Sequence, residues 1–148
     1  MSIRWTHVGD LPIPLAYHAS AVFQGKLWVI GGYTTGAPSR KVFSSIDGVT
    51  WTEAGTDALP AAFGGGITTA TVYDGKMWIF GGGLSLKKVF ASADGITWSE
   101  VGTDALPVPL ELGHSATVFD GKMWVIGGGR KAFSSTDGIT WIEPEWSA

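Results

Sequence analysis

The decapeptide FQGKLWVIGG begins at Phe23 and recurs almost unchanged from Tyr73, as YDGKMWIFGG, and from Phe119, as FDGKMWVIGG. Each copy is followed by a second repeated stretch: SIDGVTW at 45–51, SADGITW at 92–98 and STDGITW at 135–141. Self-similarity at a period of about 40–50 residues predicts an array of equivalent supersecondary units. The closing tryptophans, counted from Trp5, are spaced at 46, 47 and 43 residues. Three units therefore fill nearly all of the 148 residues.

Turn residues divide each unit into four short apolar or alternating runs, which is the pattern of β-strands. In the third unit the predicted strands are 114–119, 123–126, 131–134 and 140–143. The first two are joined by Asp120-Gly121, a dipeptide typical of a type I′ hairpin, because glycine adopts positive φ without steric cost. Asp137-Gly138 is predicted to play a similar part between the last two. The predicted units lie within a single domain spanning 1–148 and cover about 15–53, about 66–100 and about 113–143.

The composition excludes several classes of function. Ten basic and thirteen acidic side chains give a net charge of −3, so there is no electrostatic case for binding nucleic acid. The chain has no cysteine, which excludes disulfides, thiolate metal sites and thiol catalysis. Its 22 glycines and 7 prolines cut the apolar content into short pieces and favour an all-β fold. The N-terminus lacks an apolar signal-peptide core and no run is long enough for a membrane span. We therefore expect a soluble chain without a membrane partner, cytoplasmic by default.

The unit resembles a kelch repeat. It combines a small-residue strand at 18–22, the double glycine Gly31-Gly32 and the closing Trp51, and this combination occurs three times. The tyrosine that the family usually carries before the closing tryptophan is absent, and the nearest aromatics are Phe43, Phe90 and Phe133. The SIDGVTW stretch also resembles, one residue short, the Asp-box of sialidase-like propellers. The resemblance implies four-stranded blades of a β-propeller, and it carries no activity with it.

Three blades do not close a propeller, which typically has four to eight. An open arc would expose the apolar flanks of its first and last blades, and such patches drive association. Two chains give six blades and three chains give nine, so we predict a homodimer that forms a six-bladed ring around a two-fold axis. The predicted assembly is similar to that of certain bacterial fucose-binding lectins, which build a six-bladed ring from short chains. The alternative fold is a monomeric β-trefoil, which would have a mass of 15.6 kDa, half that of the predicted dimer.

The N-terminal residues 1–9 form an extra segment that copies an outer strand. Trp5-Thr6-His7-Val8-Gly9 matches the fourth strand of the first unit and its exit, Trp51-Thr52-Glu53-Ala54-Gly55. The chain thus has four such segments for three units. We expect either the N-terminal segment or the C-terminal 141–143 to supply the regular outer strand of the closing blade, with the other displaced or added at the rim.

Six tryptophans recur on the second and fourth strands of the units. Each can bury about 150–250 Å² between neighbouring blades, worth about 4–6 kcal/mol before entropy. We interpret them as structural contacts between blades, and the alternative is a sugar-stacking platform. These residues are Trp28, Trp51, Trp78, Trp98, Trp124 and Trp141.

The loops between the second and third strands differ in length, whereas the turns at the opposite end are nearly identical. Variable loops on a rigid scaffold usually carry recognition, so they supply the candidate ligand-binding residues: Tyr33, Thr34, Arg40, Lys87 and Arg130. Three further candidates begin the first strand of each unit and would line the central channel: His18, Thr68 and His114. For the channel histidines we expect capping or packing, with a metal or anion site as the alternative.

No catalytic set stands out. Asp47, Asp94 and Asp137 invite a metal hypothesis, but an aspartate in a turn normally binds its own backbone, and no second carboxylate accompanies each one. The chain contains neither a phosphate-binding loop nor a nucleophile elbow. We therefore expect a non-enzymatic scaffold or binding module without metal or other cofactor, whose ligand is a protein or a glycan. The alternatives are a carbohydrate-binding lectin and an engineered or fragmentary propeller without a native ligand.

Overall fold

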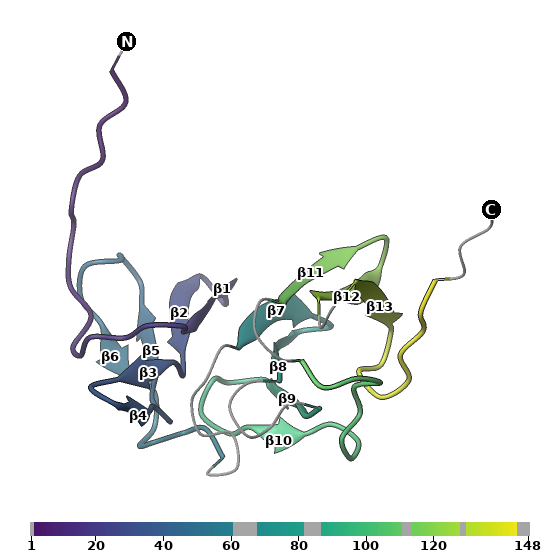
Figure 1. The fold of residues 1–148 in the computed structure, drawn as a ribbon. Coiled ribbons are helices and arrows are strands. Elements are labelled where there is room, and N and C mark those ends of the chain that lie inside the picture. Colours follow the sequence, from purple (N-terminus) through teal and green to yellow (C-terminus); the bar gives the residue numbers. More distant parts are fainter. Residues whose placement is uncertain (1, 61–67, 82–86, 111–113, 128–129, 145–148) are drawn as a thin grey trace.

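The computed structural model describes residues 2–60, 68–81, 87–110, 114–127 and 130–144, and all regular structure in these residues is β (Figure 1). Sheet 1 contains, in spatial order, β1 (Ala19–Phe23), β2 (Lys26–Ile30), β5 (Val42–Ser45) and β6 (Thr52–Glu53). Sheet 2 contains β7 (Thr69–Tyr73), β8 (Lys76–Phe80), β9 (Val89–Ser92) and β10 (Ser99–Glu100). Sheet 3 contains β11 (Ser115–Phe119), β12 (Lys122–Gly127) and β13 (Lys131–Ser135), and a separate hairpin joins β3 (Tyr33–Thr34) to β4 (Ala37–Pro38). The prediction of an all-β chain is confirmed, and every strand pair is antiparallel.

The first two strands of each sheet are joined by the predicted two-residue turns. Asp120 and Gly121 have φ values of 52° and 69°, and the turns at Gln24-Gly25 and Asp74-Gly75 agree within a few degrees. Positive φ at both central residues is the mark of type I′. The second turn is different. Between β5 and β6 the chain forms a longer loop over residues 46–51, and in each copy the glycine has positive φ while the aspartate before it does not. Asp137-Gly138 therefore lies in the connection between the last two strands, as predicted, but it does not form a two-residue type I′ turn.

Sheet 3 departs from the expected four strands. Its fourth strand is reduced to a single bridge between Ser134 and Ile142, which exchange two backbone hydrogen bonds of 2.9 Å. In sheets 1 and 2 the outer strand continues, because Ala54 and Val101 donate to the carbonyls of the third strand at 2.8 Å. The equivalent residue in sheet 3 is Pro144, which has no N–H to donate. The pairing therefore stops one step early.

The core lies between the sheets rather than within any one of them. The first strands pack beside one another, β1 on β7 and β7 on β11. One apolar cluster joins sheets 1 and 2 around Trp28, Ile30 and Ile79, and a second joins sheets 2 and 3 around Trp78, Phe80 and Val125. Each sheet is too thin to bury its own apolar faces, so its neighbours supply the cover. None of the described residues forms a helix that could cross a bilayer.

The two ends of the chain behave differently at the sheets. The N-terminal segment extends away from sheet 1 (Figure 1), and the Trp5 side chain is 95% exposed. The C-terminal segment contacts sheet 3, because Ile142 pairs with Ser134 of β13. The C-terminal segment thus keeps one bridge to its own sheet, and none of the described strand pairs includes residues 2–9; which segment completes the closing blade stays a prediction. Before β1, the chain at Ala16 lies close to the backbone of Gly32, where an added Cβ would be 2.7 Å from Ala16 O.

Candidate functional site

The loops that differ in length present some of the predicted ligand-binding residues to solvent and fix others in place. Tyr33 and Thr34 lie on the β3–β4 hairpin, where the Tyr33 hydroxyl donates to Gly36 O at 3.3 Å. Arg40 is half-buried, and its Nε donates to Leu59 O at 2.8 Å. The side chains of Lys87 and Arg130 are exposed. The arginine at position 40 is thus part of the scaffold, whereas the other two cations are accessible to a ligand.

The residues that begin the first strands divide into two groups. Thr68 and His114 are buried and converge on one carbonyl, because Thr68 Oγ1 lies 3.4 Å and His114 Nε2 lies 3.1 Å from Phe80 O. A carbonyl oxygen only accepts, so this histidine nitrogen carries the proton. His18 is exposed and lies against Gly32, where an added Cβ would be 3.0 Å from the His18 Cβ. Across the described ranges, no three histidine, aspartate or glutamate side chains are grouped as metal ligands.

The SIDGVTW loops are built identically in the three copies. The amides of Val49 and Thr50 donate to Asp47 Oδ1 at 2.8 and 2.9 Å, and the Ser45 hydroxyl donates to the same oxygen at 3.0 Å. The loops at Asp94 and Asp137 repeat these bonds to within 0.1 Å. Donation by these backbone amides holds the pKa of all three aspartates below the usual value. The prediction that each aspartate binds its own backbone is confirmed.

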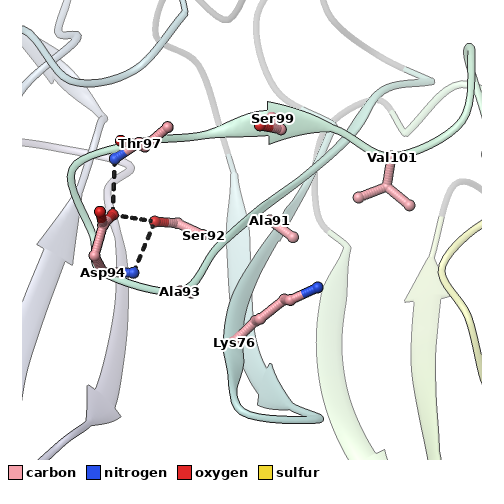
Figure 2. A pocket seen from close by; sticks show the side chains of 8 residues that line it. All are labelled: Lys76, Ala91, Ser92, Ala93, Asp94, Thr97, Ser99 and Val101. Atoms are coloured by element: carbon pink, nitrogen blue, oxygen red, sulfur yellow. Dashed lines mark hydrogen bonds between the residues drawn. The ribbon is translucent and has the colours of Figure 1, made fainter.

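A hollow of about 300 Å³ lies beside the second of these loops, in sheet 2. Figure 2 shows that Ser92, Asp94 and Thr97 form its polar wall through the hydrogen bonds of the turn itself. Lys76, at the start of β8, provides its basic group, and Val101 lies at the end opposite Asp94. The Asp94 oxygen that faces the turn is already used by three donors, so the polar lining mainly serves to shape the loop.

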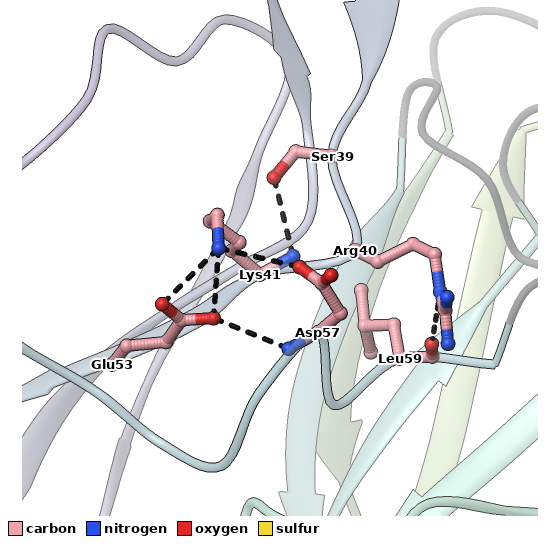
Figure 3. A network of polar contacts seen from close by, with 6 residues as sticks. All are labelled: Ser39, Arg40, Lys41, Glu53, Asp57 and Leu59. Carbon is pink, nitrogen blue, oxygen red and sulfur yellow. Dashed lines mark hydrogen bonds and ion pairs between the residues drawn. The ribbon is translucent and has the colours of Figure 1, made fainter.

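A lysine at the outer edge of sheets 1 and 2 binds two carboxylates, an arrangement we call the lysine clamp; Figure 3 shows the clamp of sheet 1. Lys41 Nζ lies 3.0 Å from Glu53 Oε1 and 3.3 Å from Asp57 Oδ1. In sheet 2, Lys88 repeats both contacts with Glu100 and Asp104 at 2.9 and 3.2 Å. Hydrogen bonds to the two carboxylates raise the pKa of each lysine above its usual value. This clamp was not predicted from the sequence, although the signal is present: the lysine precedes its glutamate by the same interval in all three units.

The tryptophans of the second strands contact the following sheet. The Trp28 ring lies on Gly95, and the Trp78 ring lies on Gly138, so closely that an added Cβ at either glycine would overlap the indole. Each ring is oriented by its own N–H, which donates to the carbonyl five residues earlier at 2.9 and 2.8 Å. Trp124 makes the same bond to Phe119 O at 2.9 Å. Its ring therefore has the orientation of the other two, but no further sheet follows in the described part of the chain to receive it.

The tryptophans of the SxDGxTW loops contact the preceding sheet. Trp98 belongs to the apolar cluster between sheets 1 and 2, and its Nε1 donates to Gly95 O at 3.1 Å. Trp141 repeats that bond to Gly138 O and packs edge-on against Phe80 with ring centroids 5.6 Å apart. Trp51, in sheet 1, is half-buried.

The two outer flanks of the arrangement expose residues that are buried elsewhere. On the flank of sheet 3, Phe119 is 69% exposed, whereas its counterpart Phe23 is 6% exposed. Ile126 is 46% exposed on the same flank, where the equivalent Ile30 is fully buried. On the opposite flank, Leu27 of sheet 1 is 42% exposed although its counterpart Met77 is fully buried. Both flanks therefore lack the neighbouring sheet that covers each face of sheet 2.

Neither the protein-family models nor the curated proteins include a match to this chain. The features that distinguish the molecule are the repeated contacts between neighbouring sheets and the two flanks where those contacts are missing.

Proposed function

We propose that this chain is a non-enzymatic binding scaffold, half of a six-bladed kelch-like β-propeller that is completed by a second copy of itself. Each of the three sheets serves as one blade. The ligand, a protein or a glycan, binds the face formed by the loops of variable length. Self-assembly is part of the function because the single chain leaves two apolar flanks open.

The observation that carries the proposal is a repeated contact: the tryptophan of the second strand packs on the glycine of the SxDGxTW loop in the next sheet. Trp28 packs on Gly95, and Trp78 packs on Gly138. If Trp124 makes the same contact, it needs the glycine of another SxDGxTW loop. Among the three described loops, Gly48 of sheet 1 is the glycine on which no tryptophan of its own chain packs. Around Gly48 the nearest described side-chain atom is Leu27 Cδ1, 3.5 Å from where a Cβ would be. A second copy supplies each missing partner to the other.

The flanks support the same pairing on a larger scale. Phe119, Trp124 and Ile126 on one side correspond to residues that, in sheets 1 and 2, pack against the next sheet. On the other side, Val22 and Leu27 correspond to residues that in sheet 2 pack against the previous sheet. The exposed flank of sheet 3 in one copy is therefore complementary to the exposed flank of sheet 1 in another. The interfaces between neighbouring sheets within the chain already consist of the two corresponding faces.

Two copies satisfy both flanks at once. A head-to-tail contact generates a ring when its rotation closes and a filament when it does not. Two chains of three sheets give six blades, within the range of known propellers. The ring then contains two equivalent interfaces of the same kind as the four within the chains, and it leaves no flank exposed.

The ligand face is proposed from the difference between the two ends of the sheets. The turns at one end are repeated almost atom for atom, as the aspartate bonds illustrate. The loops at the other end differ and expose Tyr33, Lys87 and Arg130. A repeated scaffold with one variable, partly cationic face is suited to recognition.

Two measurements test the proposal. Light scattering coupled to size exclusion is expected to give twice the 15.6 kDa mass of the chain, whereas a trefoil or an isolated arc would give the mass of one chain. A glycan array and a peptide array are then probed with the wild type and with the variant Tyr33→Ala/Arg130→Ala. Lys76→Ala, on the opposite face, is the matched control. Saturable binding that only the first variant loses supports the assigned face, and loss only with Lys76→Ala would contradict it.

A further inference from the structure

Sheets 1 and 2 are each crossed by a strap that follows the outer strand. Strap 1 is residues 55–59 and strap 2 is residues 102–106, and both have the sequence GTDAL. The strap aspartate binds the clamp lysine (Figure 3), and the strap leucine is buried and donates its N–H to the carbonyl of Arg40 or Lys87 at 3.0 Å. Each strap thus adds one ion pair, one backbone hydrogen bond and one buried leucine to its sheet.

Sheet 3 has the beginning of this arrangement without its strap. Lys131 Nζ lies 2.8 Å from Glu143, as in the other clamps, but no GTDAL sequence follows that glutamate. Among the described residues, Glu143 is the acidic partner of Lys131, whose side chain is 47% exposed, against 33% for Lys41 and 26% for Lys88. Pro144 also leaves the carbonyl of Ala132 without the donor that Val42 and Val89 receive from the outer strand.

The chain carries a third, shortened strap at its N-terminus, in the sequence Gly9-Asp10-Leu11-Pro12. In straps 1 and 2 the glycine lies against the loop of the following sheet, so that an added Cβ would be 3.0 Å from Ile96 or 3.6 Å from Ile139. Gly9 has the same relation to sheet 1, since an added Cβ there would lie 2.8 Å from Val49 Cα. The N-terminal strap therefore lies where a strap from a preceding sheet belongs, and sheet 1 is the first of the sheets in the described residues.

We infer that the N-terminal strap of one copy completes sheet 3 of the second copy, an inference that rests on the proposed ring. Asp10 binds the partner subunit's Lys131, and the Val8 N–H donates to the partner subunit's Ala132 carbonyl. The partner's outer strand ends at Glu143, and the incoming strap continues its path from there. Within its own chain, Asp10 pairs with His7 at 3.0 Å, and both side chains are largely exposed, so little is lost in the exchange.

The strap lacks the threonine and the alanine of GTDAL, so Asp10 follows its glycine directly. The exposed Lys131 side chain is long enough to meet it, because a lysine holds its charge on a flexible four-carbon stem. Residues 2–6 take no part in the contact and remain outside the ring.

Charge exchange between two variants tests the inference. Asp10→Lys places like charges opposite each other at both interfaces of its own dimer, and so does Lys131→Asp. Each is expected to weaken dimerisation at least about tenfold in sedimentation equilibrium. When the two variants are mixed one to one, the mixed dimer has one interface with two exchanged charges, which again attract, and one interface with the wild-type pair. The mixture is therefore expected to dimerise within about threefold of the wild type.

Cross-linking provides a second readout if a charge variant folds poorly. The chain has no cysteine, so Asp10→Cys and Lys131→Cys can be mixed and treated with a short bismaleimide. A covalent product of twice the chain mass in the mixture supports the exchange, and Asp57→Cys mixed with Lys131→Cys is the control expected to give none. A wild-type dimer with no rescue and no cross-link would overturn the strap exchange alone, whereas a monomeric wild type would overturn the proposed ring and the exchange with it.

Discussion

Replacing Gly48 by alanine distinguishes the proposed ring from a lone arc of three sheets. Gly48, Gly95 and Gly138 have φ values of 76°, 78° and 77°, so alanine at each has the same backbone cost of about 1–2 kcal/mol. The new methyl differs in what it meets. At Gly95 it overlaps the Trp28 ring, whereas at Gly48 the nearest described atom is 3.5 Å away. In a single chain, Gly48→Ala should therefore lower the unfolding free energy by the backbone cost alone, and Gly95→Ala by about 1–3 kcal/mol more.

In the proposed dimer, the methyl of Gly48→Ala meets Trp124 of the other copy at each of two equivalent interfaces. An overpacking cost of about 2 kcal/mol at each gives about 4 kcal/mol for the dimer. Dimerisation should weaken by about a thousandfold, since about 1.4 kcal/mol corresponds to a factor of ten.

Sedimentation equilibrium over a dilution series measures the dimerisation constant of the wild type and both variants, and urea unfolding at dilutions where the chain is monomeric measures the stability of the single chain. Gly95→Ala is the control, because its methyl meets a tryptophan of its own chain. It should lose more unfolding free energy and less dimerisation than Gly48→Ala. Combining Gly48→Ala with Trp124→Ala should cost less than the sum of the two, because both change the same contact. A Gly48→Ala dimer as tight as the wild type would refute the seating of Trp124 on Gly48.

Three further predictions concern the single chain. The aspartates of the SxDGxTW loops have lowered pKa values when folded, so their stabilisation is present above the unfolded value of about 3.9 and is lost as the pH falls through the folded value. Replacing all three by asparagine should flatten the loss of stability below about pH 4, followed by urea midpoints. Lys88 has a raised pKa, so its stabilisation should be full below about pH 10.4 and lost above it; Lys88→Met should remove that alkaline decline, and an identical slope would contradict the clamp. His114→Phe removes a donor to the buried Phe80 carbonyl and should lower the unfolding free energy by about 1–3 kcal/mol in thermal or urea unfolding.

Local patterns in the sequence predicted the strands and first turns well, because their causes are local. The dipeptide Asp120-Gly121 requires only its own backbone to form a type I′ turn, and the alternation around Trp124 reflects a strand with two different faces. The hydrogen bonds of the serine in the SxDGxTW loop were not predicted from the sequence. Its hydroxyl binds the aspartate and two backbone amides, which makes the loop longer than a two-residue hairpin.

Contacts between units were harder to predict, because they depend on how the sheets stack. Nothing in the sequence next to Trp28 shows that its ring lies on Gly95, which is 67 residues later. The sequence alone also did not show whether the C-terminal segment pairs with its own sheet, although Pro144 indicated that this pairing is short. Its missing N–H shortens the pairing of the C-terminal segment but does not prevent Ile142 from pairing with Ser134.

The stoichiometry of the native particle tests the self-assembly most directly. Multi-angle light scattering on the wild-type chain, at several micromolar concentrations, is predicted to give the mass of two 15.6 kDa chains. A folded species of 15.6 kDa at every concentration would contradict the ring, since its exposed flanks would then have no partner.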